Sequence, residues 1–339
     1  MKIIDADAKY LNSEGLHPYQ FMELAGRTCY KSEDKMTETS AKKFVSNLLK
    51  AGHTAMLEHA HIIIQTTREH AADFRDKLSC NQSYQGRHAN LSHYINVTVN
   101  ARSDTYGSFI SGSFRAFIQL FRLNDYGNKI LHDSKLETAL HVAYPELFDA
   151  PDYKDATSCK IISRSEFISA VRHAYCYAYA DVGEIVNSVI RKHLTHTVKF
   201  TCDRGVSHEF VRHRPASFAQ ESTRYCNYSN DKFENEITVI KPCYWSEDSK
   251  QMKLWKIACD FAESKYFDLL LSGATAQEAR SVLPNSLKTE LIITATEEEW
   301  QHIINLRYHG TTGKPHPQMY EVMEIAYPQL VEESCGRLK

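Results

Sequence analysis

The segment richest in side chains that can do chemistry is residues 212–225, which read Arg-His-Arg-Pro-Ala-Ser-Phe-Ala-Gln-Glu-Ser-Thr-Arg-Tyr. Residues 191–224 hold seven Lys or Arg and three acidic residues, within a chain whose formal net charge is −2. An Arg side chain offers a planar fork of N–H donors that fits a phosphate or a carbonyl edge. The segment therefore predicts a site for a phosphorylated ligand, with a surface salt-bridge patch as the alternative.

Backbone motifs that bind phosphate are absent from the sequence. It contains no G-x-G-x-x-G turn, no G-x-x-x-x-G-K-[ST] loop and no G-x-S-x-G nucleophile elbow. A protein without a glycine-rich cradle must hold phosphate with side chains, and the Arg-rich segment contains side chains of this kind.

A metal site is not predicted. Residues 208–213 read H-E-F-V-R-H, one residue longer than the zinc-binding H-E-x-x-H. Helical positions i and i+5 point about 140° apart, so both histidines cannot bind one zinc ion from a regular helix. A metal-dependent hydrolase remains an alternative that metal analysis would distinguish, and its candidate ligands are His53, His59, His208 and His213.

The elements that must position these residues alternate irregularly between helix and strand. Alternating or β-branched runs predict strands at 60–67, 93–99, 195–202 and 287–296. Helical periodicity predicts helices at 39–52, 113–122, 205–212, 245–272, 275–282, 297–306 and 319–330, and a mostly helical stretch at 165–193. The polar stretch 68–93 is predicted as loop and short helix. We expect an α+β fold whose sheet is mixed or antiparallel and flanked by helices.

Composition limits the class of protein. The 339 residues are 42% hydrophobic and 24% charged, as in globular proteins, and no apolar run approaches the roughly 20 residues that span a bilayer. The net charge of −2 argues against a nucleic-acid binder. The nine Cys form no C-x-x-C pair, and the first residues contain no secretory apolar run, so we expect a cytoplasmic protein with reduced thiols.

The Arg-rich segment resembles a known family signature. Arg212-His213-Arg214, seven residues and then Ser222 match the R-H-R…S pattern of the flavin-dependent thymidylate synthases. Other landmarks of that family follow in the same order: GHTAMLEH at 52–59, ARSVLP at 279–284, WQH at 300–302 with LR at 306–307, and HPQ at 316–318. The resemblance covers 39–67 and 196–330. It implies a single domain over 1–339, with approximately 69–195 as an insertion.

This resemblance implies a flavin-dependent thymidylate synthase-like fold and an FAD-dependent methyltransferase. Such enzymes convert dUMP to dTMP, with methylenetetrahydrofolate as carbon donor and NADPH-reduced FAD as hydride donor. They are homotetramers whose active sites are shared between subunits, and neither nucleic acid nor a membrane is an expected partner.

Site residues follow from the resemblance position by position. The expected dUMP-binding residues are Glu209, Arg212, Gln220, Glu221, Ser222, Thr223, Arg224, Arg280 and Arg307. The expected FAD-binding residues are His53, Ala55, Arg212, His213, Arg214, Gln220, Thr296 and His302. Arg307 and Ser222 are the expected catalytic residues: Arg307 polarises the uracil ring, and Ser222 binds rather than attacks, because no general base accompanies it in the local sequence.

Three of these positions depart from the compact members of the family. Ala55 replaces a small hydroxyl residue, Thr296 replaces Asn, and Glu209 replaces Gln. A longer loop, Tyr308–Pro315, also precedes His316. Two further alternatives remain at this stage: a nucleic-acid-binding module that uses 191–224, and a catalytically inactive relative with a structural role.

Overall fold

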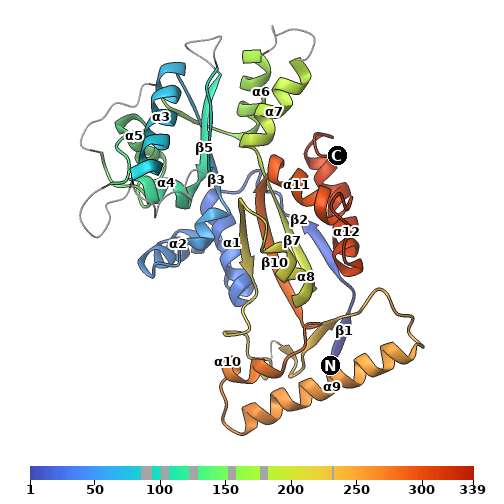
Figure 1. The fold of residues 1–339 in the computed structure, drawn as a ribbon. Coiled ribbons are helices and arrows are strands. Elements are labelled where there is room, and N and C mark those ends of the chain that lie inside the picture. The colour runs from blue at the N-terminus through green and yellow to red at the C-terminus, as the bar shows by residue number, and fades with distance from the viewer. Residues whose placement is uncertain (85–93, 101–106, 122–128, 152–157, 176–181, 231–232) are drawn as a thin grey trace.

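The computed structural model describes residues 1–84, 94–100, 107–121, 129–151, 158–175, 182–230 and 233–339. Within them, two four-stranded antiparallel sheets and a two-stranded parallel pair carry the helices (Figure 1). The predicted α+β class with antiparallel sheets is confirmed. No helix in the described ranges combines the length and apolar character that crossing a membrane requires.

The first sheet holds the predicted site segments. Its strand order is β2 (Asp7–Tyr10), β7 (Thr195–Asp203), β10 (Lys288–Thr296) and β8 (Ala216–Gln220). Ile293 of β10 lies opposite Val198 of β7 on one side and Phe218 of β8 on the other. In this register, alternate apolar residues of β7 and β10 point to the same face.

Helices cover both faces of this sheet. The helices α11 (Glu297–Arg307) and α12 (Pro317–Glu333) pack on one face, where Trp300, Ile303 and Met323 are fully buried against Phe200 and Ile293. On the other face, α1 (Pro18–Tyr30) packs Ala25 and Cys29 against Ala219 and Ile292. The short helix α8 (Arg204–Phe210) follows β7 directly and begins with an Asp203 cap on the amide of Val206.

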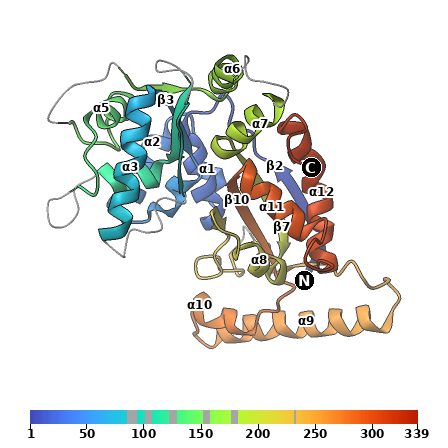
Figure 2. The ribbon, with the colours of Figure 1, turned by 45° about the horizontal axis from the view of Figure 1, so that its top comes forward.

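The second sheet lies beside the first (Figures 1 and 2). Its order is β4 (Ile95–Thr98), β5 (Ser108–Ser113), β3 (His61–Thr66) and β6 (Lys160–Ile162). The helices gathered around it are α2 (Ser40–Lys50), α3 (Arg68–Tyr84), α4 (Phe114–Phe121), α5 (Ser134–Ala143), α6 (Arg164–Tyr175) and α7 (Val182–His193). The short turn η2 (Thr54–Glu58) leads from α2 into β3 and packs against β8, so it joins the two sheets.

Elements from the start of the chain and from residues 238–282 lie at the lower side of Figure 1. There β1 (Lys2–Ile4) pairs in parallel with β9 (Thr238–Ile240), and the long helix α9 (Lys250–Leu271) lies across them. The single-turn helices η1 (Glu33–Lys35), α10 (Ala276–Ala279) and η5 (Arg280–Val282) complete the described elements. Tyr266 of α9 is fully buried against Val239 and Leu287.

One sequence prediction was wrong. Residues 68–84 form one 17-residue helix, α3, rather than loop and short helix, because buried Ala71, Phe74 and Leu78 recur at helical spacing among polar residues. The helix predicted at 245–272 is confirmed as α9, on which Leu254, Ile257 and Phe261 are exposed. The predicted segments 85–93, 122 and 176–181 lie outside the described residues.

Candidate active site

Arg307, the last residue of α11, joins three segments. Its Nε donates to Nε2 of His213 at 3.1 Å, its Nη1 to Oε2 of Glu209 at 2.7 Å, and its Nη2 to the backbone oxygen of Glu209 at 3.1 Å. Glu209 belongs to α8, and His213 to the loop after it. The Arg307 side chain is 22% exposed, so its charge is partly shielded but can be reached by a ligand.

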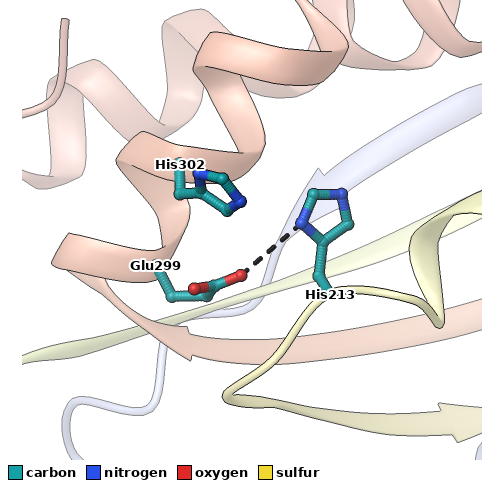
Figure 3. Close-up of side chains that lie close together, drawn as sticks. All are labelled: His213, Glu299 and His302. Carbon is teal, nitrogen blue, oxygen red and sulfur yellow. Dashed lines mark ion pairs between the residues drawn. The ribbon is translucent and has the colours of Figure 1, made fainter.

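These contacts fix the tautomer of His213. Because Arg307 Nε always carries a hydrogen, Nε2 of His213 must accept, and the proton of the neutral imidazole lies on Nδ1. Nδ1 faces Oε1 of Glu299 at 3.5 Å (Figure 3). The ring of His302, one turn along α11 from Glu299, lies 5.7 Å from the His213 ring, edge to face.

His213, Glu299 and His302 also make a candidate metal cluster, since their ligand atoms lie within 4.8 Å of one another. A metal ion at this point would need the lone pair of His213 Nδ1, which holds the proton, and it would sit near the Arg307 cation. The geometry therefore favours an oriented imidazole over a metal ligand. His208 is exposed on α8, whereas His213 lies beyond the end of that helix, so the two do not form a zinc pair.

A second group forms where β8 ends. The amide of Glu221 donates to the oxygen of Glu290 at 2.8 Å, and the amide of Ser222 donates to the oxygen of Cys29 at 3.1 Å. These bonds hold the turn that presents Ser222, Thr223 and Arg224. Arg280 Nη1 donates to Oγ1 of Thr223 at 3.3 Å, and Arg224 Nε donates to Oε1 of Gln277 at 3.0 Å.

A network of ion pairs holds the turn that contains Ser222, Thr223 and Arg224. Lys288 Nζ pairs with Oε2 of buried Glu221 at 2.9 Å and with Oε1 of Glu290 at 3.2 Å. Lys31 and Lys199 each approach Oε2 of Glu290 to 2.6 Å. Burial alone raises the pKa of Glu290, but the three lysines outweigh it and lower that pKa to about 2. The network keeps the Glu290 carboxylate charged and anchors the turn to β10.

The two groups are connected through α8. Nε2 of Gln220 donates to Oγ of Ser207 at 2.8 Å and to Oγ1 of Thr289 at 3.3 Å. Ser207 and Glu209 lie on the same short helix. The side chain that ends β8 is thus tied to the helix that positions Arg307.

The other expected site residues surround these groups. Arg212 and Arg214 are exposed, and Arg214 Nη1 donates only to the loop oxygens of Val211 and His213, at 2.8 Å each. Thr296 caps α11 by accepting from the amide of Glu299. His53 and Ala55 are exposed at η2. Within this chain, contacts bring together Glu209, His213, His302 and Arg307, and separately Thr223, Arg224 and Arg280.

Sequence reasoning missed Glu299, Lys288 and Glu290 as members of these groups. Glu299 is one of three acids, residues 297–299, in the first turn of the helix predicted at 297–306, a position that the helix dipole alone explains. A signal existed for the pair Lys288 and Glu290: they alternate on one face of a predicted strand. Such charges inside a strand indicate partners on that face.

Comparison with known proteins decides the family. The family model described as "Thymidylate synthase complementing protein" matches residues 154–332, more than half of the chain. The chain belongs to this family. The family predicted from the R-H-R signature is thereby confirmed.

Individual relatives of this family member carry the name flavin-dependent thymidylate synthase. One from Pyrococcus horikoshii is 31% identical over 144 residues, which cover 42% of this chain and 56% of the relative. One from Geobacter sulfurreducens is 35% identical over 104 residues, which cover 31% of this chain and 43% of the relative. The chain thus spans about half the length of the curated relatives it matches.

Among solved structures, a UMP/dUMP methylase, PolB from Streptomyces cacaoi bound with 5-Br dUMP, is 23% identical to the chain. The match covers 50% of this chain and 91% of that one, with a TM-score of 0.38.

Proposed function

We propose that this protein methylates dUMP to dTMP, with methylenetetrahydrofolate as carbon donor and FAD, reduced by NADPH, as hydride donor. The observation that carries the proposal is the contact of Arg307 with His213 and Glu209. It joins the histidine of the R-H-R signature to the arginine of the last site helix, in a family whose named relatives are flavin-dependent thymidylate synthases.

The residues present fit a bound FAD. Arg212 is exposed and has no ion-pair partner among the described residues. Arg214 is also exposed, and its Nη1 donates to the nearby backbone oxygens of Val211 and His213. Both guanidinium groups are available for a diphosphate. Arg212, His213, Arg214, Gln220, Thr296 and His302, with His53 and the backbone at Ala55, would hold the flavin, which supplies the hydride when bound.

In the proposed reaction Arg307 stabilises charge on the nucleotide base. A guanidinium beside a uracil carbonyl lowers the energy of the negative charge that develops as the ring becomes nucleophilic. His213 accepts from Nε and so fixes the plane of the guanidinium, which leaves Nη1 and Nη2, both of which donate to Glu209, as the atoms that would bind the base. Because Nη1 is held by the half-exposed Glu209 carboxylate, dUMP must displace that contact as it binds.

Ser222 is proposed as a binding hydroxyl. Its Oγ accepts from the amide of Arg224 at 3.4 Å, and no described histidine or carboxylate lies within hydrogen-bond distance of it. A hydroxyl without a base is a weak nucleophile. Ser222 with Arg224, Thr223 and Arg280 would bind the phosphate and sugar, held in place by the Glu221–Lys288 pair. Arg212 and Gln220 would complete the nucleotide site, with Glu209 at its edge as the carboxylate that dUMP displaces from Arg307.

We propose a homotetramer with shared active sites and a single domain, 1–339, in which roughly 69–195 is an insertion. Leu254, Ile257 and Phe261 support the assembly. They repeat at helical spacing on α9 and are 57%, 65% and 64% exposed, an apolar face that a second copy would cover. We propose a cytoplasmic location and no nucleic-acid or membrane partner.

The deciding experiment is spectroscopic and enzymatic. The purified protein should be yellow, with flavin absorbance that bleaches when NADPH is added without oxygen. Re-oxidation should then require dUMP and methylenetetrahydrofolate together and should yield dTMP. A colourless protein that binds no added FAD, or flavin turnover without dTMP, would contradict the proposal.

A further inference from the structure

A second cluster of reactive side chains lies at the second sheet. His70 of α3 contacts Asp133, the N-cap residue of α5, through Nε2, at 3.0 and 2.8 Å from the two carboxylate oxygens. Through Nδ1 it contacts Sγ of Cys159 at 3.3 Å, just before β6. The imidazole therefore lies between a thiol and a carboxylate, the order in which a nucleophile, its base and an orienting acid occur in catalytic triads.

Burial and hydrogen bonding fix this arrangement. His70 and Asp133 are only 6% and 5% exposed, and Asp133 also accepts from the amide of Leu136. Thr66, at the end of β3, donates from Oγ1 to the oxygen of Ser158, so it can only accept from Nδ1 of His70, 2.7 Å away. Nδ1 must then carry a hydrogen, which is shared between the Thr66 oxygen and the Cys159 sulfur.

The charge on His70 follows from its neighbours. Burial alone lowers the pKa of His70, but the bonds to Asp133 and Cys159 outweigh it and raise that pKa to about 9. The pKa of Asp133 is lowered, because its bond to His70 outweighs burial. The other charged groups that line the pocket beside the pair are Glu69, Asp73 and Lys77 on α3, Lys135 on α5, and the ion pair of Lys129 with Glu137. At neutral pH a positively charged N–H group of His70 thus lies 3.3 Å from the Cys159 sulfur.

We propose that Cys159 is a nucleophilic thiol, activated by His70 and Asp133, that exchanges with small disulfides to form a mixed disulfide. Cys159 is free and partly exposed. Among the described residues, the side chains that contact its sulfur are those of Thr66 and His70. Attack on a disulfide needs no oxyanion donors. This site is independent of the proposed synthase reaction.

The exchange balances without another oxidant. The Cys159 thiolate attacks one sulfur of R–S–S–R, an Sγ–S bond forms, and the S–S bond of the reagent breaks. The leaving R–S⁻ takes the proton from Nδ1 of His70, and Asp133 remains ionised beside the neutral imidazole. The small disulfide is the oxidant, and each modified chain releases one equivalent of R–SH.

The first test uses the wild-type holoprotein and reads each cysteine separately. Iodoacetamide is added under native conditions from pH 5.5 to 8.5, and alkylation at each site is followed by peptide mass spectrometry. Cys243 and Cys335 are exposed cysteines and serve as internal controls. At pH 7 Cys159 should react at least about tenfold faster than either, with a rate nearly constant across this range, whereas the control rates should rise with pH. Equal rates, or parallel pH profiles, would overturn the proposal.

The second test removes the activating groups. His70→Gln and Asp133→Asn should each slow alkylation at Cys159 at pH 7 by about tenfold, while His141→Gln, a change at another partly buried histidine of the same region, should leave it unchanged. With oxidised glutathione as the probe, the wild-type protein should gain one glutathionyl group at Cys159 first. Modification at Cys243 or Cys335 before Cys159, or a folded His70→Gln protein with wild-type rates at Cys159, would sink the idea. If His70→Gln does not fold, the wild-type pH profile still decides.

Discussion

Nε of Arg307 donates to Nε2 of His213 at 3.1 Å, although 94 positions separate the two residues in the chain. The bond aligns the end of α11 with the loop after α8. It also places the Nδ1 proton of His213 toward Glu299. One arginine thus has a fixed guanidinium plane and a half-exposed carboxylate, Glu209, as its exchangeable partner.

The first prediction concerns the charge of Arg307. Replacing Arg307 by Ala should lower kcat for dTMP formation by about 10²–10³-fold, because the group proposed to stabilise charge on the base is lost. Flavin content, measured by absorbance, should remain near the wild-type value. The matched control is Arg172→Ala on the exposed side of α6, which should retain full activity. Near-normal turnover of the Arg307→Ala protein would remove Arg307 from the mechanism.

The second prediction concerns Glu209, which we propose competes with the nucleotide for Arg307. In Glu209→Gln the side chain keeps its length but loses the charge, so dUMP displaces a weaker contact. We expect the KM for dUMP to fall by about two- to fivefold with kcat little changed, the range of a half-exposed ion pair. Steady-state kinetics at two salt concentrations check this, since added salt should reduce the difference in KM between the wild-type protein and Glu209→Gln. A rise in KM would mean that the carboxylate itself binds the nucleotide.

The third prediction separates binding from attack at Ser222. Ser222→Ala should weaken dUMP binding by about tenfold, the effect of one lost hydrogen bond to a charged group, and should leave measurable turnover at saturating dUMP. Equilibrium titration and kcat are measured on the same preparation. A protein that binds dUMP normally and makes no dTMP would show that the hydroxyl is the nucleophile after all.

Sequence periodicity was sufficient for the elements that carry the site. The apolar alternation of 287–296 and the acids at 297–299 mark β10 and α11 within one residue of their bounds, because both the packing and the dipole act locally. It failed for α3, where buried apolar positions are sparse among charged and amide side chains. On α9 the period was right, but one chain alone cannot say which surface covers Phe261.

The site itself could not be derived from spacing. Nothing within residues 204–214 indicates that His213, and not His208, contacts Arg307. That contact depends on how α8 and α11 pack on the first sheet. The resemblance supplied the list of residues, but not their division into the Arg307 group and the Ser222 group. Cys159, His70 and Asp133 had no motif at all, because they come from three elements of a region that the signature does not cover.

The fourth prediction concerns stability at low pH. His59 is fully buried beside β10, its Nδ1 lies 2.8 Å from Oγ1 of Thr294, and burial lowers the pKa of His59 to about 4. In the unfolded chain His59 has a pKa near 6.5, so it binds a proton below that pH, whereas in the folded chain it stays neutral down to about pH 4. The free energy of unfolding therefore falls as the pH drops from about 6.5 to 4. The wild-type protein should lose about 3 kcal/mol more over this window than His59→Gln. Urea denaturation of both proteins at pH 7.5, 6, 5 and 4 measures the free energy of unfolding. The same dependence on pH in the wild-type protein and in His59→Gln would contradict a lowered pKa at His59.

The fifth prediction tests the apolar face of α9. Phe261 is 64% exposed in the chain, so Phe261→Glu costs the isolated chain little but places a charge in the proposed subunit contact. We expect light scattering after size exclusion to show dissociation to smaller species, together with loss of dTMP formation and of bound flavin, because the proposed site is shared between subunits. Lys253→Glu, another exposed position on α9, is the control and should assemble normally. If Phe261→Glu remains a fully active tetramer, α9 is not the contact, and another face of the chain must complete the active site.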